Sequence, residues 1–278
     1  MDYLVSVLMP VYNGMPLIKA SIQSLLQQTY TNWECIIVDD GSNDGTSEYL
    51  DSLKDSRFII HHFSENKGRP FARQKTLELA KGDFIAMLDA EDLYAPQKIE
   101  KQVCAFKEHS EVCLVSTGMC SFGVGTDLLR VRGVKKSKLT FYDGYYTPSH
   151  ATCMLVGERA KKLKYNPYMK FGQDVDFLSR YLVGGKYYEL ADIMYYYSEF
   201  DSVTKKKIRR TYRLMMVNNR RNGKYRTSFV YFMKYVYSYL VFPFVSIEKI
   251  LKKRGRELSP NEINDYNNDC KAIIEMCV

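Results

Sequence analysis

The sequence lacks the short motifs that mark several common kinds of site. Its four histidines, at positions 61, 62, 109 and 150, have no H-E-x-x-H or H-x-x-x-H spacing, so a histidine metal site is not expected. No pair of its seven cysteines has C-x-x-C spacing, which argues against a zinc ribbon or a thioredoxin-type site. The patterns G-x-G-x-x-G and G-x-x-x-x-G-K-[ST] are also missing, which argues against dinucleotide and P-loop chemistry.

The N-terminal stretch lacks the features of a signal peptide. It reads MDYLVSVLMPVYNG, with an acid at position 2, no basic residue and only a short apolar run. The cysteines are odd in number and scattered, which is typical of reduced thiols. We therefore expect a cytoplasmic protein. Its single Trp contrasts with 23 Tyr, which indicates broad amphipathic surfaces.

Acidic residues are nearly absent from one long segment. Residues 205–256 contain 16 Lys/Arg and one acid, Glu248, whereas the whole chain has a net charge of only +8. The rest of the chain is therefore net acidic. A cationic segment of this kind is attracted to polyanions, either an anionic membrane or nucleic acid.

Short apolar runs alternate with helix-like stretches through the first hundred residues. The expected strands are 4–11, 33–38, 58–63 and 84–88, and the expected helices are 16–28, 44–54, 70–80 and 96–109. This alternation predicts an α/β fold with a mostly parallel sheet and helices on both faces. Residues 110–200 are more mixed, with a helix expected at 174–182. The basic composition after about 204 predicts a domain over 1–204 and a helical C-terminal extension over 205–278.

Polar clusters follow three of the expected strands and are the candidates for chemistry. They are Tyr12-Asn13, Asp39-Asp40 and the run from Asp89 to Asp92. Ligands of such sheets bind beyond the carboxyl ends of the strands, so we expect the clusters to share one edge. Asp39 and Asp40 could accept hydrogen bonds from a base or a ribose, or could simply form a turn before a capped helix. The acidic run suits Mg²⁺ or Mn²⁺, or could cap the next helix.

Two further segments offer phosphate ligands and a base. Residues 66–69 and Arg73 supply cations and flexible backbone for phosphate, although a solvated helix start is the simpler interpretation. Asp174 precedes an expected helix, where a carboxylate can cap the helix or act as a general base toward an acceptor hydroxyl.

Taken together, these segments resemble the family-2 glycosyltransferases, which are inverting enzymes with the GT-A fold. The matching strings are Val7 to Asn13 (VLMPVYN), Ile36 to Thr46 (IIVDDGSNDGT), Asn66-x-Gly68-x-x-x-Ala72-Arg73, and Ala80 to Asp92 (AKGDFIAMLDAED). The resemblance covers roughly residues 4–204. The order and spacing of the four motifs over ninety residues make coincidence an unsatisfactory explanation.

The resemblance implies a role for each matching residue. The donor nucleotide-sugar, expected to be a UDP-sugar, would be bound by Pro10, Tyr12, Asp39, Asp40, Asn66, Gly68, Arg73, Asp89 and Ala90. Glu91, with Asp92 as a second candidate, would hold a divalent Mn²⁺ or Mg²⁺ ion. Asp174 would be the catalytic base that deprotonates a glycan or lipid-linked acceptor.

Three positions depart from the family pattern. Glu91 stands where Asp is usual, Gln173 stands where Glu usually precedes the base, and the segment around Tyr197 and Glu199 lacks the Arg and His that many members carry. These departures keep open a non-catalytic nucleotide-sugar-binding protein of the same fold. A sugar nucleotidyltransferase is a weaker alternative, because the first loop, Pro10 to Gly14, has no basic residue.

The basic segment contains an aromatic stretch at residues 227–247, TSFVYFMKYVYSYLVFPFVSI, with eight aromatics and one charge. Tyr, Lys234 and Pro243 argue against a membrane span, so we expect this stretch to lie on an anionic leaflet, at the inner face of the cytoplasmic membrane. The alternative is a helix that packs its aromatic residues against the catalytic domain. No nucleic-acid-binding module is recognisable, so no nucleic-acid partner is expected.

Overall fold

The computed structural model describes residues 2–123, 126–144, 146–169, 172–198, 204–221, 223, 225–252 and 255–277. Its contacts divide the chain into two compact units, each discontinuous in sequence. Unit 1 comprises Met1–Cys120, Gly133–Tyr197 and Leu258–Val278, and unit 2 comprises Ser121–Arg132 and Ser198–Glu257.

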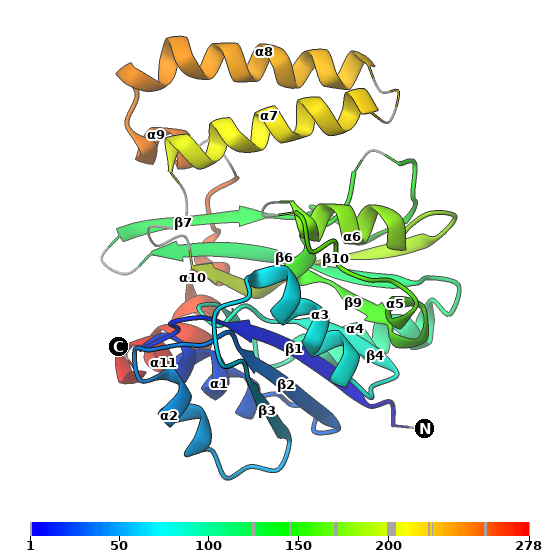
Figure 1. The fold of residues 1–278 in the computed structure, drawn as a ribbon, viewed down its shortest axis with the longest axis vertical. Coiled ribbons are helices and arrows are strands. Elements are labelled where there is room, and N and C mark those ends of the chain that lie inside the picture. Colours follow the sequence, from blue (N-terminus) through cyan, green and yellow to red (C-terminus); the bar gives the residue numbers. More distant parts are fainter. Residues whose placement is uncertain are drawn as a thin grey trace. The chain divides into compact units, whose positions relative to one another are not determined.

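Unit 1 is built on a mixed β-sheet with the strand order β3-β2-β1-β4-β9-β6-β10-β5, and β8 pairs with β10 (Figure 1). The strands are β1 (Val5–Val11), β2 (Trp33–Asp39), β3 (Phe58–His62), β4 (Phe84–Met87), β5 (Leu93–Tyr94), β6 (Leu114–Gly123), β8 (Lys138–Phe141), β9 (Met154–Val156) and β10 (Lys186–Ser198). The pairs β1–β2, β2–β3 and β1–β4 are parallel, whereas β9 is antiparallel to both β4 and β6. The parallel half predicted from residues 4–88 is confirmed.

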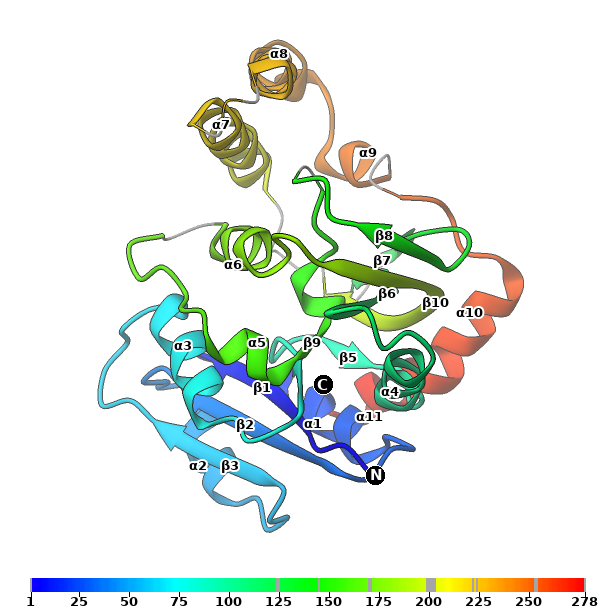
Figure 2. The ribbon, with the colours of Figure 1, turned by 90° about the vertical axis from the view of Figure 1, so that its right-hand side faces the viewer.

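Helices cover both faces of this sheet. Those of unit 1 are α1 (Ile18–Leu26), α2 (Thr46–Asp51), α3 (Arg69–Leu79), α4 (Lys98–Glu108), η1 (His150–Thr152), α5 (Gly157–Lys161), α6 (Gln173–Tyr181), α10 (Pro260–Tyr266), η3 (Asn267–Lys271) and α11 (Ala272–Cys277). Alternate residues of β1 enter different cores, since Val7 packs with α1 and α4 while Leu8 packs with α3 and α6. Burial on both faces explains why the strand is almost entirely apolar, with Ser6 as its one polar residue (Figure 2).

Unit 2 contains a helical hairpin. Its elements are β7 (Thr126–Arg132), α7 (Lys205–Arg221), α8 (Tyr225–Val241), η2 (Phe242–Phe244) and α9 (Ile247–Lys252), and α7 lies beside α8 (Figure 1). Arg209 joins the two helices, because its Nη2 donates to the Ser238 carbonyl at 3.0 Å and its guanidinium lies over the Tyr239 ring at 4.4 Å. Among the described helices, none has both the length and the apolar character that a membrane span requires.

The contacts divide the C-terminal region differently from the predicted extension over 205–278. Unit 2 ends at Glu257, and α10 to α11 belong to unit 1. There α11 contacts α1, Cys270 and Ile273 are buried, and the Tyr196 hydroxyl donates to Asp269 at 3.4 Å. Composition did not reveal this return, because the anchoring contacts join residues that are far apart in the sequence.

Candidate active site

Three loops that follow parallel strands meet at one edge of the sheet. β1 lies between β2 and β4, with Val11 opposite Asp39 and Leu8 opposite Met87. The residues that follow these strand ends therefore share one edge, as predicted from the polar clusters. A direct tie joins two of the loops, since the Asp40 amide donates to the Val11 carbonyl at 2.8 Å.

Asp39 holds the turn after β2 in place. Its carboxylate is buried and accepts from the Ser42 amide at 3.0 Å, from the Ser47 hydroxyl, and from His62 Nδ1 at 2.9 Å. Burial by itself would raise the pKa of Asp39, but the hydrogen bonds from Ser42, Ser47 and His62 outweigh it and lower that pKa. Because its partners are protein groups, Asp39 positions the loop.

Asp40 joins the end of β2 to the turn before α3. Its two carboxylate oxygens accept from the backbone amides of Lys67 at 2.7 Å and Gly68 at 2.9 Å. Gly68 has a φ of 97°, which a glycine adopts without strain, and it is the N-cap of α3. Burial raises the pKa of Asp40, and the two amides partly oppose that rise. Each oxygen keeps a second lone pair for a donor on a ligand.

The loop after β1 is locked onto the loop after β2. The Asn13 amide donates to Ser42 Oγ at 2.8 Å, and Asn13 Oδ1 accepts from the Asn43 amide at 2.9 Å. Asn13 has a φ of 52°, a conformation that Asn tolerates better than most residues. Next to it Tyr12 is half-exposed, so its ring is free to cover a flat ligand, while Pro10 is half-buried in β1.

Arg73 and Asp89 form an ion pair beside this edge. Arg73 is buried in α3, and its Nη2 lies 3.2 Å from Asp89 Oδ1. Burial would lower the pKa of Arg73, but Asp89 raises it above its usual value; burial likewise would raise the pKa of Asp89, but Arg73 lowers it. The exposed Arg69 lowers the Asp89 pKa as well. Phosphate therefore has two guanidinium groups within electrostatic reach of this pair.

The remaining residues of the acidic run have different surroundings. Ala90 is buried in the core, and its carbonyl accepts from Ser21 Oγ at 2.8 Å. Asp92 is fully buried and accepts from the Tyr195 hydroxyl at 2.6 Å, which suits a bracing role better than the predicted metal-binding one. Burial and the charge of Asp89 both raise the pKa of Glu91.

The acidic run does not cap the following helix, since the N-cap of α4 is Gln97 and it forms no side-chain cap. Among the described residues, no group of three or more His, Cys, Asp and Glu side chains is arranged to hold a metal by itself. Two crowded carboxylates remain, on Asp89 and Glu91. Such a pair suits a hard cation that shares its coordination sphere with substrate phosphate.

Asp174 lies in the first turn of α6, near the Arg73–Asp89 pair. Gly172 is the N-cap of this helix and no side-chain cap is formed, so Asp174 is not used as the cap. Its charge acts on both Arg73 and His150, which places it within electrostatic reach of each. A half-buried carboxylate in this position is able to take a proton from a bound hydroxyl.

Two side chains of the site were not predicted as such, His150 and Tyr165. His150 Nε2 lies 2.8 Å from the Tyr165 hydroxyl, and both residues are buried against Phe177. Burial, with Arg73, lowers the pKa of His150 to about 4, so the imidazole is neutral at physiological pH. The histidines had been considered only for metal spacing, and no local pattern marks a histidine whose partners come from other elements.

The remaining predicted residues are placed as follows. Asn66 is exposed, and its side chain has no hydrogen bond within the part of the chain that the structure describes. Gln173 is buried at the start of α6. Tyr197 belongs to β10, whereas Glu199 lies outside the described residues.

Comparison with known sequences points to one family. Residues 6–161 match the family model described as Glycosyl transferase family 2. WfgD of Escherichia coli, a UDP-Glc:alpha-D-GlcNAc-diphosphoundecaprenol beta-1,3-glucosyltransferase, is 44% identical over 102 residues, which cover 37% of this chain and 40% of WfgD. This alignment therefore spans about two fifths of that relative. EpsE of Bacillus subtilis (strain 168), which is named as a glycosyltransferase, is 33% identical over 215 residues, covering 73% of this chain and 76% of EpsE.

Solved structures share the fold. Residues 1–349 of S. aureus TarS in complex with UDP align with a TM-score of 0.62 at 18% identity, over 98% of this chain and 80% of that chain. The mannosyltransferase PcManGT from Pyrobaculum calidifontis, in complex with GDP-Man and Mn²⁺, aligns with a TM-score of 0.57 at 21% identity, over 88% and 72%. The GT-A fold is thus confirmed. With a family match over more than half of its length, the chain belongs to glycosyltransferase family 2.

Proposed function

We propose that the protein transfers a sugar, with inversion at the anomeric carbon, from a UDP-sugar to a hydroxyl of a glycan or lipid-linked acceptor. The observation that carries this proposal is the grouping of Asp174 with Arg73 and Asp89 beside the carboxyl ends of the parallel strands. The UDP of the TarS complex and the UDP-Glc in the name of WfgD support a uridine donor. The lipid diphosphate in that name supports a lipid-linked acceptor in polysaccharide biosynthesis.

The reaction needs one proton transfer and one displacement. The Tyr12 ring would cover the uracil, the remaining lone pairs of Asp40 would accept from it, and Arg73 would attract the diphosphate. Asp174 would remove the proton of the acceptor hydroxyl. The acceptor oxygen then bonds to the anomeric carbon from the face opposite the diphosphate, and the bond from that carbon to the diphosphate oxygen breaks. The products are the inverted glycoside and UDP.

A divalent ion fits this arrangement. Glu91, assisted by Asp89, would hold Mn²⁺ or Mg²⁺, and the bound ion would offset the negative charge of the diphosphate. The charge of Asp89, after burial, raises the pKa of Glu91, which supports this assignment because a cation would relieve the repulsion. The Mn²⁺ in the PcManGT complex supports it as well.

The Asp174→Asn substitution tests the function. We expect release of UDP from UDP-Glc or UDP-GlcNAc in the presence of acceptor to fall by about a thousandfold, because the amide cannot accept the proton. The Mn²⁺-dependent rise in melting temperature that UDP produces should stay unchanged. Asp176→Asn is the matched control, since Asp176 lies on the same helix and pairs with Arg180 at 2.7 Å. Near-normal turnover of Asp174→Asn would disprove the assignment of the base.

We also propose that unit 2 attaches the enzyme to the inner face of the cytoplasmic membrane. One side of α8 packs on α7 through Ser228, whose hydroxyl donates to the Met216 carbonyl at 2.8 Å, and Ser238. The other side is apolar and exposed, at Phe229, Val230, Phe232, Met233, Val236, Tyr237 and Leu240. An exposed apolar face of this size marks an interaction surface.

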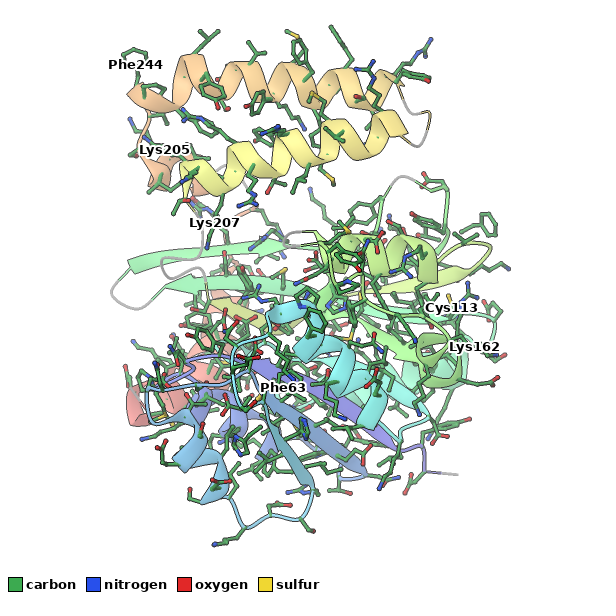
Figure 3. All side chains as sticks on the ribbon, in the orientation of Figure 1. Phe63, Cys113, Lys162, Lys205, Lys207 and Phe244 are labelled. Carbon is green, nitrogen blue, oxygen red and sulfur yellow. The ribbon has the colours of Figure 1, made fainter. Side chains whose placement is uncertain are left out.

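The positive charge of α7 favours an anionic partner for the exposed face of α8. Cationic side chains cluster on α7, including Lys205 and Lys207, and Phe244 projects beyond α8 (Figure 3). An apolar helix face accompanied by Lys and Arg fits an anionic lipid leaflet, to which each cation near the surface contributes about 1 kcal/mol.

A further inference from the structure

Gln173 carries a buried oxygen that has no partner among the described residues. The residue is 4% exposed, and its Oε1 accepts no hydrogen bond from the described chain. Folded proteins rarely leave such an oxygen unpaired, because losing its water without gaining a donor destabilises the native state. Gln173 immediately precedes Asp174 at the start of α6, so a ligand bound at Asp174 could supply the missing donor.

His150 has a second unused group in the same region. Tyr165 is the one hydrogen-bond partner found for its imidazole among the described residues, and it occupies Nε2. The Tyr165 ring stacks on Phe177 with centroids 4.3 Å apart, which fixes the hydroxyl that orients the imidazole. The Nδ1 edge is therefore left for a ligand. The charges of Arg73, Asp174 and Asp89 act on the pKa of the ring, so His150 lies within electrostatic reach of these three residues.

We propose that Gln173 and His150 bind hydroxyl groups of the transferred sugar beside Asp174, an inference that rests on the proposed transferase function. The chemistry of the two groups selects this ligand. An amide oxygen can only accept a hydrogen bond, and an ionised diphosphate offers acceptors but no donors. A sugar hydroxyl both donates and accepts, so it can satisfy Gln173 Oε1 and also pair with the neutral imidazole of His150. Gln173 would then discriminate between donor sugars, which gives a function to the Gln that stands here in place of the usual Glu.

The test compares the binding of UDP with that of UDP-sugars. In the presence of Mn²⁺, UDP, UDP-Glc and UDP-GlcNAc are each titrated in a calorimeter into three proteins. These are the unmodified full chain and its Gln173→Met and His150→Leu variants. We expect the affinity of each variant for UDP to stay within about twofold of that of the unmodified protein. The affinity for the UDP-sugar that the unmodified protein binds best should fall about fivefold in each variant, which is the effect of losing one neutral hydrogen bond. His150→Asn, which keeps a polar group near Nδ1, should recover part of that loss.

A stability measurement separates ligand binding from a structural role. Gln173→Met has nearly the same shape and removes the unpaired oxygen, so its melting temperature without ligand should be higher than that of the unmodified protein. His109→Leu serves as control, because His109 stacks on Tyr188 at 4.1 Å and its substitution should alter neither UDP nor UDP-sugar binding.

The outcomes are distinguishable. If the unmodified protein binds neither UDP nor a UDP-sugar, the proposed function itself fails, and the inference fails with it. If it binds them but Gln173→Met and His150→Leu retain full UDP-sugar affinity, or lose UDP affinity in the same proportion, the inference is overturned and the proposed function stands.

Discussion

The proposed nucleotide-binding edge of unit 1, which is formed by the loops after β1 and β2 and is called the nucleotide edge below, differs from the helical hairpin of unit 2. The two regions differ in how many of their side chains have partners within the protein. At the edge, Asp39, Asp40 and Asn13 are each engaged by backbone amides or neighbouring side chains. In the hairpin, Phe229 is 62% exposed and Leu240 is 67% exposed. Groups of the edge are paired within unit 1, whereas the outer face of α8 presents exposed apolar side chains.

This difference indicates that the edge is preorganised for a ligand, whereas the hairpin is suited to association with a partner. The loops after β1 and β2 need not rearrange to receive a nucleotide, because internal hydrogen bonds already hold them. The outer face of α8 can contribute free energy only when a partner covers it, since exposed apolar area is favourable only when it leaves water. Substitutions should therefore affect folding and nucleotide binding at the edge, and association at the hairpin.

Among the substitutions that test this comparison, the largest effect is expected from Phe229→Ser combined with Leu240→Ser. Removing two exposed apolar side chains should cost about 2 kcal/mol of membrane binding, roughly a thirtyfold loss. Co-sedimentation with vesicles that contain anionic lipid measures this loss. UDP binding should not change, because neither residue takes part in the hydrogen bonds that hold the loops after β1 and β2.

The matched control for the hairpin is Phe141→Ser in β8, because Phe141 is also 62% exposed. It should sediment with vesicles as the unmodified protein does. The membrane proposal is wrong if the unmodified protein stays in the supernatant at low salt, or if the double variant only abolishes self-association in light scattering.

A smaller effect is expected from Asp40→Asn, which tests whether the edge is held from within. The amide keeps one acceptor and turns a donor toward the second backbone amide, which should cost about 1 kcal/mol of unfolding free energy. Denaturant titration measures this, and UDP should raise the melting temperature less than in the unmodified protein. Glu158→Gln, whose side chain is 83% exposed, is the control and should leave both quantities unchanged. Equal stability of Asp40→Asn would refute the bracing role.

The smallest effect is a pH dependence of the unfolding free energy that arises from His62. Its hydrogen bonds to Asp39 at 2.9 Å and Asp51 at 3.2 Å outweigh burial and raise its pKa in the folded state above 6.5. The contribution of His62 to the unfolding free energy is therefore complete below its pKa in the unfolded state. It is lost as the pH rises through its pKa in the folded state. Because its side chain is 35% exposed, solvent screening limits this contribution to under about 1 kcal/mol.

His62→Gln tests this linkage. The unmodified protein should exceed the variant in unfolding free energy at about pH 6, and the difference should shrink by about pH 8.5. Denaturant titrations must stay well above the acidic range in which Asp39, whose pKa is lowered, would itself become protonated. A difference that grows with pH would contradict the assigned sign.

Much of the parallel half of the fold was predictable from local patterns. Residues 4–11 and 33–38 are apolar because helices cover both faces of the sheet, and β1 and β2 occupy nearly the same ranges. β5 and β8 were not predicted. β5 has two residues, and β8 is largely exposed, so neither has the apolar pattern that marks a strand.

The candidate site was predictable to a similar degree. Asp40, Asp89 and Asp174 were found because strand ends and family motifs mark them in the sequence. The bracing of Asp92 by Tyr195 joins residues about a hundred positions apart, and no pattern along the chain announces such a pair. The return of α11 to α1 was missed for the same reason.

The sequence alone was sufficient to identify the family, the parallel strands and the carboxylates that follow them, because these depend on local hydrophobic period and on short motifs. Tertiary structure decided which of those carboxylates are engaged by protein groups and which remain for a ligand. It also showed that Gln173 Oε1 is buried with no partner in the described part of the chain, and that His150 is oriented by Tyr165. The physical reason is that burial and hydrogen bonding depend on neighbours in space, and at this site those neighbours come from α3, η1 and α6.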